Sequence, residues 1–263
     1  MNETIELSRD NGRATVWMNR PDKHNAFNET LIAELDAAFA QLDADATVRV
    51  VVLAGRGKSF SAGADLNWMK AQGEASEAAN VADARKLADM LARLATLAKP
   101  TIARVHGAAL GGGMGLASAC DICVASARAV FATSEVKFGL TPATISPYVL
   151  RAIGPRQAHR YFLTAERIEA PRAFELGLVH ELVEDEAALD AKLAELVDAI
   201  LLGGPGSQAA AKDLIRAVAY QPVTEAVLDD TARRIAALRA TPEAKEGLAA
   251  FLDKRPAAWA AKA

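Results

Sequence analysis

The chain has 263 residues, a formal net charge of −3 and 51% hydrophobic residues, so it can bury a sizeable core in one or two domains. The mild acidity and the lack of a long basic run argue against a nucleic-acid surface, which needs clustered lysine and arginine. The start, MNETIELSRD, has neither the basic nor the apolar region of a secretory signal, and the longest uncharged apolar stretch (105–120) is shorter than the roughly 20 residues of a membrane helix. We therefore expect a cytoplasmic protein without a membrane segment or a nucleic-acid partner.

The first half of the chain alternates strand and helix patterns. Short β-branched or apolar runs predict strands, and apolar residues at helical spacing predict helices. In chain order we expect a strand over 14–18, a helix that begins after Asn28 and carries Leu31, Leu35, Phe39 and Leu42, a strand over 48–53 buried on both faces, a helix marked by Leu87, Met90, Leu91 and Leu94 that stops near Pro100, and strands over 101–105, 121–127 and 130–133.

From about residue 144 onward the pattern is almost wholly helical. Thr241-Pro242-Glu243 is typical of a helix start, because a capping residue is followed by a proline and an acidic side chain in the first turn. Two of the predicted strands, 48–53 and 101–105, each lead into a loop of small residues. The combination indicates a layered α/β core followed by a helical C-terminal portion.

The glycine-rich stretch at 106–121 reads HGAALGGGMGLASACD. It does not match the dinucleotide pattern GxGxxG, because Leu116 or Ser118 stands where the third glycine belongs. The GKS at 57–59 does not complete a P-loop, because Val52 replaces the first glycine. Two interpretations remain: tight helix packing, or close approach of a ligand oxygen to the free N–H groups at a helix start, as in an oxyanion hole. The stretch alone favours packing.

Cys120 and Cys123 form a CxxC pattern. A zinc site would need further cysteine or histidine ligands at matching spacing, and the four histidines are scattered along the chain. Both cysteines lie where an apolar helix gives way to an apolar strand, so we interpret them as buried, unreactive thiols.

Several separated motifs, in a consistent order, resemble the crotonase superfamily of enoyl-CoA hydratases and isomerases. The resemblance covers nearly the whole chain. It rests on NRPDKHNAF (19–27), FSAGADL (60–66), the HG and LGGG of 106–113, CDI (120–122), SEVKFGLTP (134–142), LTA (163–165), AFELGLV (173–179) and FLDKRP (251–256). Residues 134–154 look most similar to bacterial 3-methylglutaconyl-CoA hydratases and related hydratases of branched enoyl-CoA.

The resemblance implies an α/β fold: a crotonase-like spiral of strand–strand–helix units over residues 1–200, and a helical region over 201–263 that builds trimers, often paired into hexamers. The substrate would be an acyl-CoA thioester, with no metal and no cofactor beyond the coenzyme A that the substrate carries. The thioester carbonyl would accept hydrogen bonds from the main-chain N–H groups of Ala64 and Gly112, and Glu135 would act as general acid and base with a raised pKa. The other residues that the resemblance assigns to substrate binding are Lys23, Asn25, Ala26, Ala62, Asp65, Leu66, Gly111 and Lys254.

Two of these assignments have a structural alternative of equal weight. Asp65 fits a helix cap. Lys254 fits an ordinary charge late in a helix, whereas in the functional interpretation it reaches a CoA phosphate across a subunit contact.

The chain departs from the hydratase pattern at Gly115, where hydratases of this family usually carry a second glutamate. Our first hypothesis is a hydratase for a short or branched 2-enoyl-CoA, with 3-methylglutaconyl-CoA as one candidate and Glu135 handling both water and proton. The single carboxyl is also compatible with an enoyl-CoA isomerase. A third alternative is a weakly catalytic relative that binds CoA or RNA.

Overall fold

Two β-sheets and the helices around them make up the computed structural model, which describes residues 2–260. The larger sheet has the strand order β1-β2-β3-β4-β6-β9 and the smaller one the order β5-β7-β8. The strands are β1 (Ile5–Asp10), β2 (Arg13–Met18), β3 (Val50–Gly55), β4 (Thr101–Val105), β5 (Ala108–Leu110), β6 (Ile122–Ser126), β7 (Val130–Ala132), β8 (Ile168–Glu169) and β9 (Glu181–Val183).

Ten α-helices lie within the described residues, together with two 3-10 turns, η1 (Pro21–Lys23) and η2 (Glu135–Phe138). The helices are α1 (Glu29–Ala44), α2 (Leu66–Glu74), α3 (Glu77–Thr96), α4 (Gly112–Ala119), α5 (Ser146–Thr164), α6 (Ala170–Glu175), α7 (Glu186–Leu201), α8 (Pro205–Val218), α9 (Glu225–Arg239) and α10 (Pro242–Leu252).

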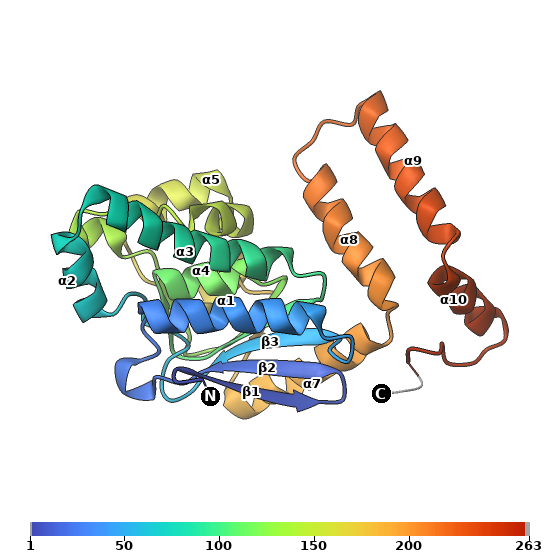
Figure 1. The fold of residues 1–263 in the computed structure, drawn as a ribbon, viewed down its shortest axis with the longest axis horizontal. Coiled ribbons are helices and arrows are strands. Elements are labelled where there is room, and N and C mark those ends of the chain that lie inside the picture. Colours follow the sequence, from blue (N-terminus) through green and yellow to red (C-terminus); the bar gives the residue numbers. More distant parts are fainter. Residues whose placement is uncertain (1, 261–263) are drawn as a thin grey trace.

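The larger sheet is buried on both faces, as the β-branched run at 48–53 predicts. β1 and β2 form an antiparallel hairpin, and the remaining neighbours in this sheet, β2-β3-β4-β6-β9, all pair in parallel. Successive side chains of a strand point to opposite faces. Val51 and Leu53 therefore join the main core, whereas Val50 and Val52 pack with the apolar side of α7 in a second cluster. Figure 1 shows α1 and α7 on opposite sides of these strands.

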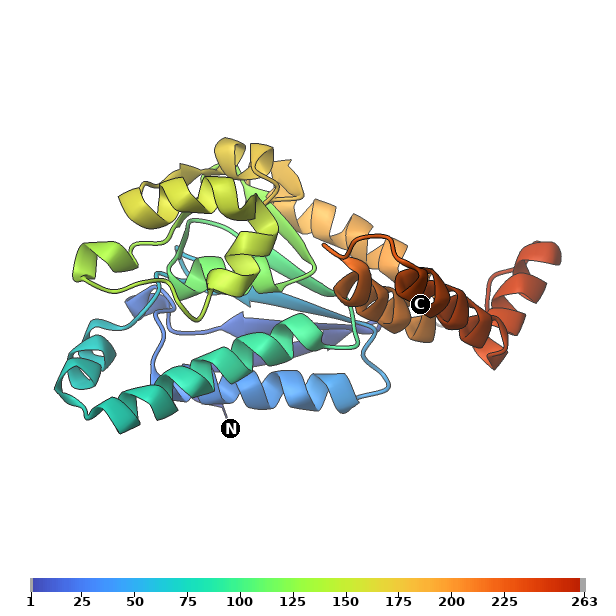
Figure 2. The ribbon, with the colours of Figure 1, turned by 90° about the horizontal axis from the view of Figure 1, so that it is seen from above.

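The helix starts that the sequence predicts are present. The side chain of Asn28 accepts a hydrogen bond from Leu31 N–H and caps α1, and the side chain of Thr241 accepts one from Ala244 N–H and caps α10. Helices α1 and α3 run side by side along one face of the molecule (Figure 2). The buried residues of α3 are Met90, Leu91 and Leu94.

The expectation of an almost wholly helical chain after residue 144 is wrong at two places. The short strand β8 pairs with β7, and β9 pairs in parallel with β6 and extends the larger sheet. The hairpin strand β1 and the three-residue β5 were also not predicted. β5, β8 and β9 have only two or three residues each, too few to show a periodicity, so only their pairing partners define them. This reason does not apply to β1, which has six residues.

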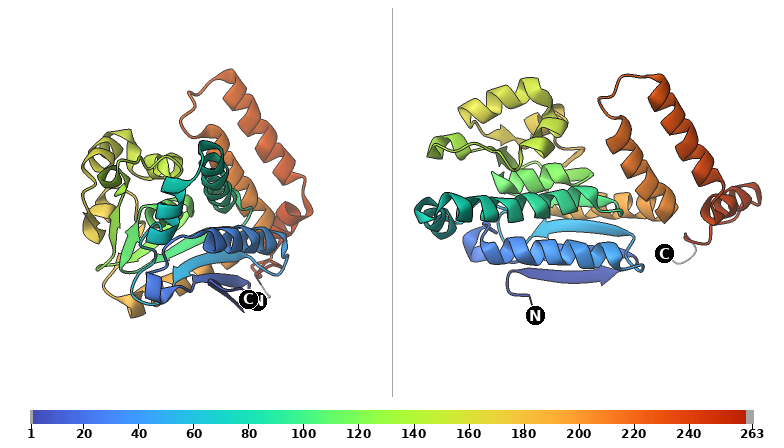
Figure 3. Two further views of the ribbon diagram at one scale, coloured as in Figure 1. Left: turned by 60° about the vertical axis from the view of Figure 1, so that its left-hand side comes forward. Right: turned by 45° about the horizontal axis from the view of Figure 1, so that its top comes forward.

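The C-terminal arm, defined here as residues 205–252 with helices α8, α9 and α10, extends away from the body (Figures 1 and 3). Lys212 on α8 ties it to the body, because its Nζ donates to Asp121 Oδ2 at 2.5 Å and to Lys99 O at 2.9 Å. Large apolar side chains of the arm lie on its surface; among them are Ile215, Leu228, Ile235, Leu248 and Phe251. No helix among the described residues has the length and apolar character needed to cross a membrane.

Candidate active site

Two loops of small residues meet beyond the ends of β3 and β4. These strands are parallel neighbours, so the segments that follow them emerge at the same edge of the sheet. Ser61 pairs with Ala109: its N–H donates to Ala108 O at 2.9 Å, and its carbonyl accepts from Leu110 N–H at 2.9 Å. The loop at 60–65 and the glycine-rich stretch therefore form one continuous surface.

The glycines of this region are required by close approach of one backbone to another. Gly63 has φ +92°, and a Cβ there would lie 3.0 Å from Leu110 O. A Cβ on Gly113 would overlap the carbonyl oxygen of Ser61. Side chains at these positions would push the two loops apart. These contacts confirm the packing interpretation, because the glycines allow the two loops to lie against each other.

Two main-chain N–H groups at this junction are free. Within residues 2–260, the N–H groups of Ala64 and Gly112 donate to no other protein group. Gly112 is the first residue of α4, where an N–H has no acceptor inside the helix and the helix dipole adds positive potential. The residues that precede the two donors touch, because a Cβ on Gly63 would lie 3.9 Å from the Cα of Gly111.

Phe27 links the two donors, and its role was not predicted. Its N–H donates to Gly63 O at 2.7 Å and its carbonyl accepts from Asp65 N–H at 2.8 Å, so its backbone pairs with the strand-like stretch around Ala64. Its ring packs on the other donor residue: a Cβ on Gly112 would lie 2.5 Å from Phe27 Cε2. Phe27 belongs to the segment that carries the family resemblance, but nothing in the sequence pairs position 27 with position 112.

Glu135 brings a carboxyl group to the same place. Its Oε1 would be 3.1 Å from a Cβ on Gly111, and its Oε2 is buried without a hydrogen-bond partner among the described residues. Burial raises the pKa of Glu135, and a hydrogen bond from its own backbone N–H offsets this only in part. A carboxyl group that is more readily protonated, beside two free N–H donors, is suited to proton transfer next to a polarised carbonyl.

Asp65 is both a helix cap and half of an ion pair. Its Oδ1 accepts from Asn67 N–H at 2.9 Å at the start of α2, and its Oδ2 lies 3.0 Å from Arg20 Nη2. Burial by itself would raise the pKa of Asp65, but the hydrogen bonds from Arg20 and from the backbone outweigh it and lower the pKa. The capping alternative is therefore correct. Arg20, which anchors the loop, was not singled out by the sequence. Leu66, the next residue, is exposed.

The segment 23–26 lies along the loop at 60–65. Ala62 N–H donates to His24 O at 2.9 Å, and Lys23 is exposed. Asn25 is fully buried: its Nδ2 donates to Arg56 O and Ser59 O, and its Oδ1 accepts from Arg20 N–H. Because protein groups occupy these polar atoms, the Asn25 side chain shapes the loop from beneath, and any substrate contact falls to the backbone here. Ala26 beside it is also buried.

Lys254 is not part of this cluster within one chain. It follows α10 at the end of the C-terminal arm and is exposed, with φ +54°. Figure 1 shows α10 and α2 at opposite ends of the molecule. The cysteine interpretation is correct: Cys120 and Cys123 are buried and free, and burial raises the pKa of Cys123 to about 12. No cluster of three or more possible metal ligands occurs among residues 2–260.

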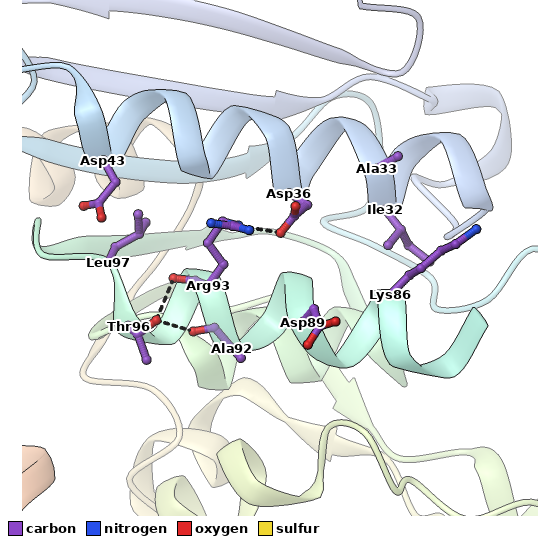
Figure 4. A pocket seen from close by; sticks show the side chains of 10 residues that line it. All are labelled: Ile32, Ala33, Asp36, Asp43, Lys86, Asp89, Ala92, Arg93, Thr96 and Leu97. Carbon is purple, nitrogen blue, oxygen red and sulfur yellow. Dashed lines mark hydrogen bonds and ion pairs between the residues drawn. The ribbon is translucent and has the colours of Figure 1, made fainter. Parts of the chain in front are cut away.

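A groove of about 610 Å³ lies between α1 and α3, apart from the two loops described above (Figure 4). It includes the ion pair of Arg93 and Asp36 at 2.6 Å. None of the predicted site residues lines it. Its lining residues are Ile32, Ala33, Asp36, Asp43, Lys86, Asp89, Ala92, Arg93, Thr96 and Leu97.

Comparison with known proteins gives a consistent result over the whole chain. Residues 8–262 match the family model described as enoyl-CoA hydratase/isomerase. A putative enoyl-CoA hydratase of Thermus thermophilus is 36% identical over 92% of this chain and 95% of its own length, and the 2,3-dehydroadipyl-CoA hydratase of Escherichia coli is 34% identical over 97% of each chain. The crystal structure of an enoyl-CoA hydratase from Shewanella pealeana superposes with a TM-score of 0.95 at 42% identity, covering 98% of this chain and 96% of that one.

Proposed function

Since the chain belongs to the enoyl-CoA hydratase/isomerase family, we propose that it adds water to a short or branched 2-enoyl-CoA at the junction of the two loops. One observation carries the proposal: the carboxyl of Glu135, whose Oε2 is buried, lies against Gly111, directly before the free N–H of Gly112 and next to the loop that presents Ala64. Two relatives that are named as hydratases, and that are 36% and 34% identical to this chain, support a hydration reaction.

In this proposal the thioester carbonyl oxygen accepts hydrogen bonds from Ala64 N–H and Gly112 N–H. Both donors are main-chain groups held by β-type pairing and by a helix start, so they need no rearrangement as charge grows on the oxygen. Donors fixed in this way stabilise the enolate, and loss of one such donor typically costs about 10²–10³ in rate.

Glu135 carries both proton transfers. As a carboxylate it takes a proton from water while the water oxygen bonds to Cβ of the enoyl group, and the electron pair moves to the thioester oxygen as an enolate. As a carboxylic acid it then returns the proton to Cα, which restores the thioester and leaves a 3-hydroxyacyl-CoA. A pKa raised by burial suits a group that must both accept and donate near neutral pH.

One observation favours a second candidate, the double-bond isomerase. Gly115 provides no second carboxyl, so a single acid/base group serves the start of α4. An isomerase needs only one such group, because it moves a proton between two carbons and does not hold water. A weakly catalytic CoA- or RNA-binding relative is the third alternative, which salt-dependent RNA retention would reveal.

The experiment is a panel of CoA thioesters with mass spectrometry of the products. It contains a linear short 2-enoyl-CoA, a 3-methyl-branched one, 3-methylglutaconyl-CoA and a 3-enoyl-CoA in heavy water. The hydratase proposal expects products heavier by one water from at least one 2-enoyl substrate. Deuterium uptake with migration of the double bond, and no gain of water by any 2-enoyl substrate, would instead establish the isomerase.

The proposal extends to the assembly. Exposed apolar side chains on α9 and α10 are typical of a protein–protein interface, and Phe251 has 81% of its surface exposed. We propose that the C-terminal arms assemble the chain into a trimer or a hexamer. Lys254 then serves the substrate bound by a neighbouring subunit, since it follows α10, which lies at the opposite end of the molecule from α2.

A further inference from the structure

A side chain at position 115 would point towards the turn of backbone against which the carboxyl of Glu135 lies. Gly115 N–H donates to Gly111 O at 3.0 Å, so the two residues are one helical turn apart on the same face of α4. Side chains on a helix lean towards its N-terminus and cover the preceding turn. The preceding turn here begins at Gly111, against which Glu135 Oε1 lies.

The side chain of Ile145 occupies that space. A Cβ on Gly115 would overlap Ile145 Cγ2 and would lie 2.8 Å from Ile145 Cβ. Ile145 is 2% exposed, and it is fixed at the start of α5 because its carbonyl accepts hydrogen bonds from Tyr148 N–H and Val149 N–H, each at 3.1 Å. Neither the side chain nor its backbone can withdraw without disturbing the α4–α5 packing.

We propose that Ile145 determines which acid/base groups this site can contain: it fills the side-chain space of position 115, keeps a second carboxyl away from Glu135 and leaves Glu135 to serve both proton transfers. The chemical part of this inference rests on the proposed function, whereas the steric part stands on the contact between α4 and α5 alone. A carboxyl can enter position 115 only if position 145 is reduced at the same time.

The steric part is tested by thermal unfolding, without substrate. Alanine forms helices better than glycine does, so Gly115→Ala would stabilise the protein if the space around position 115 were open. Here it is expected to lower Tm by roughly 3–10 °C. Ile145→Ala removes Cγ2, the overlapping atom, but keeps Cβ, which would lie 2.8 Å from the added methyl group. In that background the decrease should therefore shrink to half or less without disappearing. Ile145→Val removes only Cδ1 and keeps Cγ2, so it is the matched control and should leave the decrease unchanged. The same Tm shift in all three backgrounds would overturn the proposal.

The chemical part is tested with the pair Gly115→Glu and Ile145→Ala. Hydration of a linear short 2-enoyl-CoA by the double variant should rise about tenfold or more over Ile145→Ala alone, because a positioned acid/base group contributes that much or more. The pH profile of kcat/KM should also gain a second ionisation, which a purely structural effect would not produce. A rate and profile equal to those of Ile145→Ala would refute the chemical role. If the unsubstituted chain hydrates no thioester, the proposed function fails, while the Tm comparison still decides the steric part.

Discussion

The carboxyl of Glu135 lies against Gly111, the residue that precedes helix α4. Its Oε1 would be 3.1 Å from a Cβ on Gly111, and the backbone of Gly111 has φ +50° with its N–H donated to Ala132 O at 2.8 Å. The glycine therefore meets two requirements: it adopts a backbone conformation that other residues rarely adopt, and it leaves room for the carboxyl group.

Gly111→Ala should thus reduce stability and activity together. The strained backbone is expected to cost about 1–3 kcal/mol in the free energy of unfolding, and the new methyl group displaces the Glu135 carboxyl. Urea unfolding and thioester turnover measure the two effects. Gly73→Ala is the control: Gly73 is exposed in α2, and a Cβ there meets nothing within 4 Å. If Gly111→Ala behaved like Gly73→Ala, the close approach would be unimportant.

Glu135→Gln should abolish most turnover and keep the fold. The amide has nearly the same shape but cannot accept and return a proton, so we expect a loss of about 10²-fold or more in kcat. Circular dichroism and Tm report whether the fold is retained. Glu74→Gln, at the exposed end of α2, removes one carboxylate from the surface and should leave turnover unchanged. Full activity of Glu135→Gln would remove this residue from the mechanism.

The raised pKa of Glu135 predicts a specific pH dependence of stability. An unfolded glutamate titrates near about 4.3, and burial moves the folded value upward. Between the two values the folded chain binds more protons than the unfolded chain, so the free energy of unfolding falls as pH rises through this window. Relative to Glu135→Gln, the unsubstituted chain should lose stability from about pH 4 upward. Parallel Tm curves for the two proteins across pH 4–7 would contradict this prediction.

The ion pair of Arg20 and Asp65 should have the opposite dependence, because the pKa of Asp65 is lowered in the folded chain. Its stabilisation is present above about pH 4 and is lost as pH falls through the lowered value. Asp65→Asn, which retains a side-chain oxygen able to cap α2, should cost about 1–3 kcal/mol in unfolding free energy at pH 7.

Comparison with Asp65→Ala separates the contribution of the cap from that of the charge. Asp65→Ala removes both, so it should cost about a further 1 kcal/mol in unfolding free energy relative to Asp65→Asn. Urea unfolding at pH 7 and in acid distinguishes the two contributions: the effect of Asp65→Asn should fade on acidification, and the additional effect of Asp65→Ala should persist. A deficit of Asp65→Asn that grew in acid would show that the ion pair does not stabilise the loop.

The exposed apolar residues of the C-terminal arm predict an assembly that one charge can disrupt. Phe251→Glu places a carboxylate where Phe251 is 81% exposed, and it should lower the molar mass measured by light scattering on a size-exclusion column. Val81→Glu, at an exposed position of α3, is the matched control and should leave the mass unchanged. A monomeric unsubstituted chain would refute the proposed assembly.

The sequence was sufficient for the features that local patterns encode. Asn28 and Thr241 cap helices as predicted, β4 covers the predicted 101–105, and the β-branched run at 48–53 overlaps β3 in a sheet that is buried on both faces. These features depend on residues a few positions apart, for which propensity and periodicity are informative. Family motifs spread along the chain predicted a common site for Glu135, Ala64 and Gly112, and the structure brings these residues to one junction of loops.

Only the tertiary structure decided which distant residues share a space. Phe27 on Gly112, Arg20 on Asp65 and Ile145 on Gly115 are contacts between residues 30–85 positions apart, and a single sequence holds no record of such pairs. The short strands β8 and β9 exist for the same reason, because pairing with β7 and β6 defines them. The composition of each segment sets what it can form locally, whereas the packing of whole elements sets which atoms meet, and at this site that packing leaves room for one carboxyl group.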